Sequence, residues 1–495
     1  MTNQPNSQTN PVSAQDPQLA TLFAEALPSA ERDLAARYAP ILCFDRREPF
    51  LPLAGGVTLF RQDGESPSFP RRIELSPPGQ PPATLAIEYA IWWDWDIQHL
   101  YELEHVWVYV DGQGRVVRVE ASWHGGYHEM AQDGQPSLRH GQARVYSEPG
   151  KHAFAPTPDW FRRRWQAQKR HASDALAGAG GVWVTPLFEE ELRDQRTPEN
   201  NTLVRTYLLR QAFQPSWDFS QEFRLQPDQL VPWPALAQWI PQRVRWWLDR
   251  LHREIPAGEY RPLRLRSASI PGDPGRAGRA RGGQNGESLE GLRARLDPRV
   301  DALHVPVRAT ADGQAIVRDG ALVQDLDGRG VMVHQASLAQ LQALDAPGRA
   351  SLLLLEQVLE LSRQEDVGLY LEILDGEAIP AIVQAYDRYD LVHRAILGSF
   401  RADWLAALRD QLPRAATALL FDTVQVDAVA LAQAVGADYV HPRWEGKAQA
   451  SRLLTPEWLA RVRDAGLGVI AWPESRPEEA ARLERLGVDG LYLAG

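Results

Sequence analysis

The chain has 495 residues, of which 44% are hydrophobic and 24% charged, and its formal net charge is -11. This length is too great for one hydrophobic core and predicts two or three domains of the soluble globular type. The negative charge argues against nucleic acid or an anionic membrane as the main partner, because phosphate affinity depends on Lys and Arg. The single cysteine, Cys43, cannot form an internal disulfide, so no oxidising compartment is required.

Residues 1–18 are rich in Asn, Gln, Ser and Pro. They lack the basic start and apolar core of an export signal, and no later run approaches the ~20 apolar residues that cross a bilayer. We therefore expect a disordered tail, no transmembrane segment and a cytoplasmic protein.

Between residues 19 and 260, short β-type runs give way to a Trp-rich stretch, and we expect one domain here. The predicted strands are 85–93, 106–110 and 116–120, with Asp111-Gly-Gln-Gly114 as a hairpin turn between the last two. An amphipathic helix is predicted by the spacing of Trp239, Val244, Trp247, Leu248 and Leu251. A Gly- and Arg-rich stretch, 276–286, is expected to be a flexible loop.

Residues 261–495 alternate apolar β-type runs with helical stretches, which indicates parallel strands joined by crossover helices. Eight or more such strands favour a closed barrel, but nine candidates are present and the sequence does not identify the surplus one. The candidate strands are 263–266, 302–307, 315–317, 368–373, 395–399, 417–421, 437–440, 466–472 and 490–493. The predicted helices are 338–344, 352–361, 404–412, 426–435, 456–465 and 477–486.

A candidate cation site lies at the start of a strand in the first domain. Glu102 and Glu104 are two residues apart, so on a strand they face the same way. His99 lies just before the predicted strand, with Asp94 or Asp96 just before that. Carboxylates with one imidazole suit a divalent cation, with Ca²⁺, Mg²⁺ or Mn²⁺ favoured by the oxygen majority. A solvated charged face is the alternative interpretation.

Three histidines further along the chain extend this candidate site. They are His124, His128 and His152, in Trp123-His-Gly-Gly-Tyr-His128 and Val145-Tyr-Ser-Glu-Pro-Gly-Lys-His-Ala153. His124 and His152 are added to the candidate ligands.

An ordered series of motifs in the carboxy-terminal half resembles the glycerophosphodiester phosphodiesterase family. The motifs are Glu287-Ser-Leu289, Ala302-Leu-His-Val-Pro-Val-Arg308, Thr310-Ala-Asp-Gly313, Ile316-Val-Arg-Asp319, Gly328-Arg-Gly330, Leu371-Glu-Ile-Leu374 and Gly487-Val-Asp-Gly-Leu491. The resemblance implies an α/β fold over residues 261–495, a TIM (β/α)8 barrel of the phospholipase C-like phosphodiesterase type. It also implies proton transfer by two histidines and a divalent metal held by three carboxylates.

The residues at the family's catalytic positions differ from that pattern. One histidine position falls among Arg266-Ser-Ala-Ser269, where no histidine occurs, and the other falls on Arg318. His304 and Pro306 stand at the paired metal carboxylates.

Only Glu372, the third carboxylate, and Asp319 remain of the family's set. One carboxylate does not hold Mg²⁺ or Ca²⁺ tightly, so we expect an inactive barrel. Arg308 and Arg318 near its mouth are candidates for binding a phosphate group without hydrolysing it.

The first domain resembles the Nep-like necrosis-inducing proteins and a vacuolar-sorting-related group over about 70 residues. His99, Glu102 and Glu104 fall on the first histidine, aspartate and glutamate of their Gly-His-Arg-His-Asp-Trp-Glu motif, while Tyr101 and Leu103 depart from it. The resemblance implies a β-sandwich-like α+β domain with a bound cation. It does not carry over the toxicity of those exported proteins.

Three functions therefore compete. The first is a non-catalytic binding protein whose barrel recognises a small phosphorylated or glycerol-like ligand. The second is a metal-dependent hydrolase that works from the amino-terminal site, and the third is a divergent but active phosphodiesterase. Fold alone does not choose among them.

Overall fold

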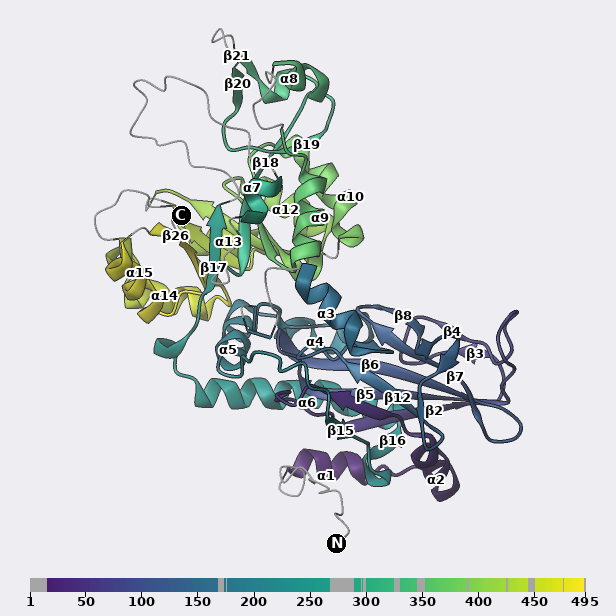
Figure 1. Cartoon of the computed structure of the whole chain (residues 1–495). Helices are drawn as coiled ribbons and strands as arrows, with labels where there is room; N and C mark the ends of the chain where they lie inside the picture. Colours follow the sequence, from purple (N-terminus) through teal and green to yellow (C-terminus); the bar gives the residue numbers. More distant parts are fainter. Residues whose placement is uncertain are drawn as a thin grey trace. The chain divides into compact units, whose positions relative to one another are not determined.

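The computed structural model describes most of the chain (Figure 1). The described residues are 16–167, 173–174, 176–267, 289–294, 296, 300–324, 330–344, 352–389, 391–423, 426–443, 450–474 and 476–493. Most of the expected disordered tail, the Gly- and Arg-rich loop 276–286, and the motif residues 268–269, 287–288 and 328–329 lie outside them. Within the described part, no helix is long and apolar enough to cross a membrane.

The chain forms two compact units, and neither is one continuous segment. The first comprises Met1–Gln166, Val184–Asp194 and Gln211–Arg250, and the second comprises Ala167–Trp183, Gln195–Arg210 and Leu251–Gly495. Short 3-10 helices occur in both: η2 (Pro186–Phe188), η3 (Arg193–Gln195), η4 (Pro227–Gln229), η5 (Ala257–Glu259), η6 (Val333–Gln335), η7 (Gly376–Ala378) and η8 (Ala450–Leu453).

The first unit is rich in β-structure. Its strands are β1 (Ile41–Phe44), β2 (Ala54–Phe60), β3 (Gly64–Glu65), β4 (Arg72–Ile73), β5 (Leu85–Trp95), β6 (His99–Val110), β7 (Val116–Trp123), β8 (Gly126–Glu129), β9 (Ala131–Gln132), β10 (Gln135–Pro136), β11 (Leu138–Arg139), β12 (Gln142–Ser147), β13 (Phe154–Ala155), β15 (Gln221–Phe223) and β16 (Leu230–Pro232). The helices that begin in it are α1 (Pro17–Phe23), α2 (Ser29–Tyr38), α3 (Pro158–Ala167), α4 (Glu189–Leu192) and α6 (Trp233–Glu254), the last of which contains the predicted amphipathic helix.

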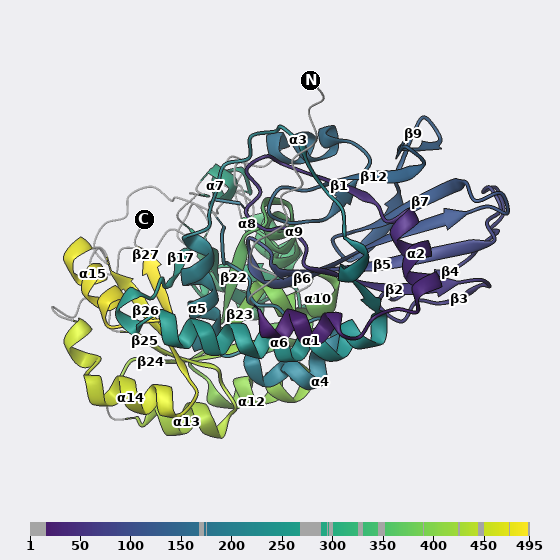
Figure 2. The same ribbon diagram turned by 90° about the horizontal axis from the view of Figure 1, so that it is seen from below.

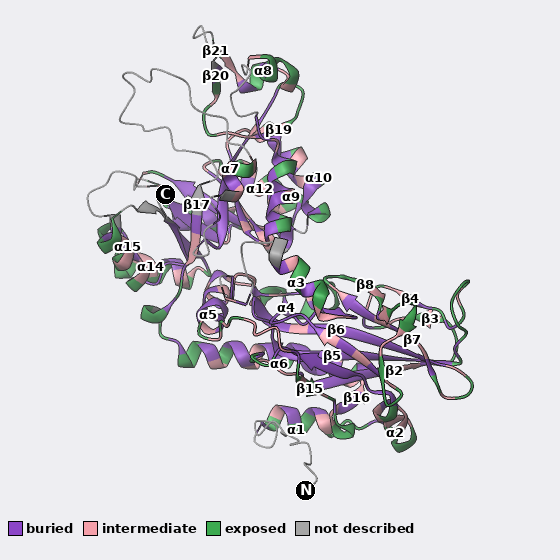
Figure 3. Cartoon of the chain, in the orientation of Figure 1, coloured by how far each residue is buried: buried purple, intermediate pink, exposed green. Residues whose placement is uncertain are grey.

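Two sheets of this unit share one hydrophobic core. One sheet has the order β16-β2-β5-β6-β7-β8, and the other has the order β11-β12-β1-β15 with β13 on β12. Apolar side chains of both sheets meet in the core, for example Phe44 from β1 with Ile87 from β5 and Val108 from β6. Figure 3 shows that β5 and β6 are buried along most of their length.

The hairpin of β5 and β6 positions the candidate cation site. Its strands pair from Leu85↔Val110 to Trp95↔Leu100, so residues 96–98 form a tight turn. The strand β6 therefore begins at His99, and the candidate ligands lie on the hairpin itself rather than ahead of a strand that begins near residue 106. The turn closes because Asp96 accepts a hydrogen bond from the Gln98 backbone amide at 2.6 Å.

The second unit is a closed barrel with additional elements. Its strands are β14 (Gly181–Val182), β17 (Leu263–Ser267), β18 (Ala302–Ala309), β19 (Ala315–Val317), β20 (Leu322–Gln324), β21 (Gly330–Met332), β22 (Gly368–Ile373), β23 (Ala395–Ser399), β24 (Ala416–Phe421), β25 (Tyr439–Pro442), β26 (Gly468–Glu474) and β27 (Gly490–Leu493). Its helices are α5 (Pro198–Leu209), α7 (Leu289–Ala294), α8 (Leu338–Leu344), α9 (Leu355–Glu365), α10 (Ile379–Arg388), α11 (Leu391–Arg394), α12 (Ala402–Gln411), α13 (Ala428–Ala434), α14 (Pro456–Asp464) and α15 (Pro477–Arg485).

The predicted barrel is confirmed. Parallel strands follow the order β17-β27-β26-β25-β24-β23-β22-β18, and pairing of β17 with β18 closes the ring. The surplus candidate is β19, which pairs antiparallel with the end of β18. Figure 2 shows α12, α13, α14 and α15 outside the barrel strands. Helix α10 was not among the predicted helices, and Pro380 lies in its first turn, where proline is tolerated.

Residues of each barrel strand alternate between two cores. Leu303, Val305 and Val307 of β18 join the core that includes apolar residues of the surrounding helices. Ala302 joins a second cluster, which includes Tyr370 and other residues of the barrel strands. The two-residue period of a strand thus separates an outer core from a barrel interior.

Helix α5 belongs to the barrel unit, although it precedes the first barrel strand by more than fifty residues. The hydroxyl of Thr202 donates to the Asp489 carboxylate at 2.8 Å, and Arg463 forms an ion pair with the same carboxylate at 2.9 Å. Asp489 also accepts from the Val469 amide of β26 at 2.8 Å. One buried carboxylate therefore ties α5 to two barrel elements.

We expect Thr202→Val to lower the free energy of unfolding of the barrel unit by about 1–2 kcal/mol. It removes one donor from the buried Asp489 carboxylate while keeping the side-chain shape. Chemical denaturation of the full chain measures the loss. The control is Thr58→Val, at a half-buried strand position of the first unit. Equal effects of the two substitutions would contradict the role of Asp489.

Candidate functional site

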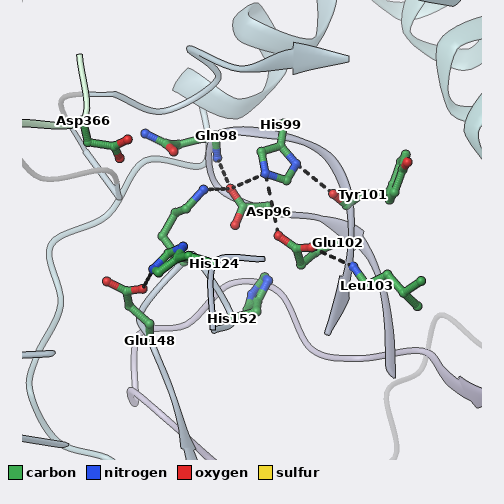
Figure 4. Close-up of polar contacts among 12 residues, drawn as sticks. Asp96, Gln98, His99, Tyr101, Glu102, Leu103, His124, Glu148, His152 and Asp366 are labelled. Atoms are coloured by element: carbon green, nitrogen blue, oxygen red, sulfur yellow. Dashed lines mark hydrogen bonds and ion pairs between the residues drawn. The ribbon is translucent and has the colours of Figure 1, made fainter. Parts of the chain in front are cut away.

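Three potential metal ligands converge at the β5–β6 hairpin. They are Asp96, His99 and Glu102, and one ligand atom from each lies within 4.8 Å of the others. The His99 Nε2 atom is 3.6 Å from Asp96 Oδ1 and 3.7 Å from Glu102 Oε2. Figure 4 shows that both carboxylates face the same edge of the imidazole ring.

The orientation of His99 suits a ligand. Its Nδ1 lies 2.8 Å from the Tyr101 carbonyl oxygen, which can only accept a hydrogen bond, so Nδ1 carries the proton. Burial lowers the pKa of His99 to about 4, so its ring is neutral near pH 7 and Nε2 presents a lone pair towards the carboxylates. Metal-binding histidines are commonly held by such a bond to a carbonyl. Tyr101 itself has a positive φ of 60°, a costly conformation for a bulky residue.

Asp96 is fully buried and ionised. Its Oδ1 accepts from the Gln98 amide and from Lys151 Nζ, the latter at 3.0 Å. Burial opposes ionisation, but the positive charge of Lys151 holds the pKa of Asp96 below its ordinary value. Its second oxygen, Oδ2, is buried without a hydrogen-bond partner among the described residues.

Glu104 is buried and Glu102 is partly buried, and both lie beside other carboxylates. Burial, and then the charge of Glu104, raises the pKa of Glu102 well above its ordinary value. Burial is also the main reason that the pKa of Glu104 rises to about 7, against a hydrogen bond from Ser122. Like charges in a dry site repel one another, and a bound cation relieves that repulsion.

The other predicted ligands have different partners. Asp94 accepts two bonds from the Arg243 guanidinium, at 2.9 and 2.7 Å, and one from the Trp92 indole. His124 Nε2 lies 2.8 Å from Glu148.

His152 Nε2 lies 3.4 Å from Glu48, and its ring stacks on Trp93 with centroids 4.7 Å apart. Sequence reasoning missed Glu48, Glu148 and Lys151. The last two lie inside the quoted motif that ends at Ala153, but Glu48 carries no local signal.

In the barrel, His304 and Glu372 lie inside the ring and bind each other. His304 Nε2 is 2.8 Å from Glu372 Oε2, and both side chains are buried. The other imidazole nitrogen, Nδ1, is 3.3 Å from the Tyr492 hydroxyl. The second Glu372 oxygen, Oε1, is buried with no partner among the described residues.

A second buried histidine, His441, extends the polar interior. Its Nδ1 lies 2.6 Å from the Tyr370 hydroxyl. Burial, and then the proximity of His304, lowers the pKa of His441 well below its ordinary value. Sequence reasoning missed it, although it lies two residues after Tyr439, which points into the barrel, so the strand period predicts the same direction.

The two arginines proposed for phosphate binding, Arg308 and Arg318, form hydrogen bonds to other groups of the protein. Arg318 donates to the carbonyls of Gly320 and Leu322, at 3.0 and 2.9 Å. Arg308 pairs with Asp375 at 2.9 Å and donates to the backbone carbonyl of Asp319.

The described barrel residues do not fit a divalent cation. Pro306 stands opposite Glu372 in the strand register and offers no side-chain donor. Asp319 is exposed, whereas His304 and Glu372 are buried. That leaves Glu372 with His304, which already bond to each other, whereas Mg²⁺ and Ca²⁺ take at least six ligands, mostly oxygens.

Residues 279–493 match the family model of the Glycerophosphoryl diester phosphodiesterase family. The family resemblance of the carboxy-terminal half is therefore confirmed. The match does not reach the first unit, so the Nep-like resemblance stays a prediction.

Individual relatives are distant in sequence. A glycerophosphodiester phosphodiesterase of Caldanaerobacter subterraneus is 23% identical over 217 residues, which make up 41% of this chain and 86% of that protein. The structure of a putative glycerophosphoryl diester phosphodiesterase from Silicibacter pomeroyi is 22% identical, with a TM-score of 0.36, over 42% of this chain and 84% of that one. An Oleispira antarctica phosphodiesterase, solved with the product sn-glycerol-3-phosphate, is 17% identical, with a TM-score of 0.38, over 47% and 92%.

We expect acidification to destabilise the protein through His441. Its folded-state pKa lies well below the ordinary value of about 6.5, so below that pH the unfolded chain binds the extra proton. The stabilisation is complete above pH ~6.5 and is lost progressively as the pH falls below that value. Denaturant unfolding at several pH values should show this loss reduced in His441→Gln. The exposed control, His140→Gln, should follow the wild type, and parallel curves for all three proteins would contradict the assignment.

Proposed function

We propose that this protein is a non-catalytic binding protein. Its barrel has the glycerophosphodiester phosphodiesterase fold without hydrolytic activity, and its amino-terminal unit binds a divalent cation at Asp96, His99 and Glu102. The observation that carries the proposal is the bond between His304 and Glu372, which engages the remaining barrel carboxylate.

Proton transfer is also poorly supported in the barrel. A general acid or base needs a proton position open to the substrate. Both nitrogens of His304 face protein groups, and the low pKa of His441 keeps it unprotonated near pH 7. Neither histidine is placed to supply a proton to a leaving group.

The ligand that we propose for the barrel is a small glycerol-like or phosphorylated molecule. The guanidinium groups of Arg308 and Arg318 already donate to protein oxygens, which weakens the case for phosphate. The buried Glu372 Oε1 needs a donor, and a hydroxyl group supplies one. These contacts favour an uncharged, glycerol-like group.

The cation proposal rests on donor chemistry in the first unit. The Nε2 lone pair of His99 faces Asp96 and Glu102, so three electron-rich atoms surround one position. The buried Asp96 Oδ2, without a described partner, is an independent sign of a missing ligand. One imidazole with carboxylates suits Mn²⁺ best among the ions considered, with Ca²⁺ and Mg²⁺ as alternatives.

For the barrel, we expect no release of glycerol phosphate from glycerophosphocholine or glycerophosphoethanolamine. The full chain is incubated with Mg²⁺, Ca²⁺ or Mn²⁺, and an active family member is assayed in parallel. Turnover that disappears in Glu372→Ala would refute the proposal and show that the site works with a different set of residues.

For the cation, we expect Mn²⁺ to raise the thermal midpoint of the EDTA-treated full chain. A ligand that binds only the folded state contributes about 3 kcal/mol at a hundredfold excess over its dissociation constant. The shift should vanish in Asp96→Asn and Glu102→Gln and persist in the exposed control Asp159→Asn. Equal midpoints with Mn²⁺, Ca²⁺, Mg²⁺ and EDTA, together with metal-free purified protein, would leave only a solvated or protonated acidic cluster. Metal-dependent hydrolysis of a generic ester, lost in Glu102→Gln, would instead support the amino-terminal hydrolase.

A further inference from the structure

Lysine is rare in this chain, yet one lysine lies beside Asp96 in the candidate cation site. Of the 53 Lys and Arg residues, three are lysines: Lys151, Lys169 and Lys447. Lys151 is 9% exposed, and its Nζ lies 3.0 Å from Asp96 Oδ1. That is the oxygen nearest to His99 Nε2 in the candidate cation site.

A rigid turn delivers Lys151 to this position. The backbone amide of Lys151 donates to the Glu148 carbonyl, and the Gly150 carbonyl accepts from Ile97 in the hairpin turn. Gly150 has a φ of +73°, and a Cβ there would lie 2.7 Å from the Ile97 side chain. The turn is therefore locked against the same hairpin that carries Asp96.

A neighbouring aspartate shows the contrast between lysine and arginine. Asp94 is held by two bonds from the planar guanidinium of Arg243, a geometry that fixes both groups. Asp96 is held by one bond from an ammonium on a flexible stem. An ammonium is a point charge that can turn away from its partner, whereas a bidentate guanidinium pair resists exchange.

We propose that Lys151 is the resident counter-ion of the metal-free centre and that a divalent cation binds by displacing its ammonium group from Asp96. This inference rests on the proposed cation site. The ammonium and the metal compete for Asp96 Oδ1, the oxygen that faces His99 Nε2, so Lys151 sets the affinity of the site. In the metal-free protein its ammonium group donates to the buried Asp96 carboxylate.

The first test compares Mn²⁺ binding by titration calorimetry on the full chain. We expect Lys151→Met, which keeps the length of the stem without the charge, to bind Mn²⁺ at least tenfold more tightly than the wild type. Lys151→Arg, which keeps the charge, should bind no more tightly than the wild type. The matched control is Arg164→Met, which removes a cation that pairs with Glu148 at 3.2 Å and has no described bond to the three ligands; its affinity should stay within threefold of the wild type.

The second test uses the native chain and does not depend on a variant that folds. An amine-acetylating reagent has three lysines to modify, and peptide mass spectrometry reports each one. We expect Mn²⁺ to raise the acetylation of Lys151 severalfold relative to Lys169 and Lys447, because the displaced ammonium becomes accessible.

The outcomes of these tests distinguish failure of the Lys151 displacement from failure of the cation site on which it rests. Mn²⁺ binding that is equal or weaker in folded Lys151→Met, or binding that leaves Lys151 acetylation unchanged or reduced, overturns the displacement but not the cation site. Absence of Mn²⁺ binding in both the wild type and Lys151→Met overturns the cation site and, with it, the displacement.

Discussion

A carboxylate taken out of water must be given a compensating charge or a set of hydrogen bonds, and this cost shapes both units. In the barrel unit, the Asp489 carboxylate pairs with the guanidinium group of Arg463, and the Glu372 carboxylate pairs with the imidazole of His304. In the first unit, the Asp94 carboxylate pairs with the guanidinium group of Arg243. Around Asp96, by contrast, the carboxyl groups of Asp96, Glu102 and Glu104 outnumber the one nearby ammonium group, that of Lys151. The raised pKa values of Glu102 and Glu104 distinguish this cluster from the carboxylates of Asp94 and Asp489, which pair with arginines.

The outer core of the barrel and its interior are built from two separate sets of side chains. The outward-facing residues of each strand, such as Val305 and Leu371, contribute to the large core shared with the helices. The inward-facing residues, such as His304 and Tyr370, fill the interior. A change of inward-facing residues is therefore expected to alter the chemistry of the interior with little effect on the outer core.

The strand and helix periods were sufficient to predict the barrel, because each depends on residues close in sequence. They did not predict which strand was surplus, since the antiparallel pairing of β19 with β18 is a tertiary contact. The candidate cation ligands Asp96, His99 and Glu102 were found because they lie within seven residues of one another. Glu48 was missed because its partner in the same region, the backbone amide of Gly150, lies 102 residues further along the chain.

The segmental make-up of the two units also constrains how the protein can be divided. Each unit is assembled from three separate stretches of chain, so the polypeptide passes between them several times. Helix α5, which completes the barrel unit through Thr202, is flanked in sequence by stretches of the other unit. A single protease cut near residue 250, or a gene fusion at that point, would yield a barrel without this helix. We therefore expect that neither unit can be separated intact from the other by a single cut, unlike domains joined end to end by a linker.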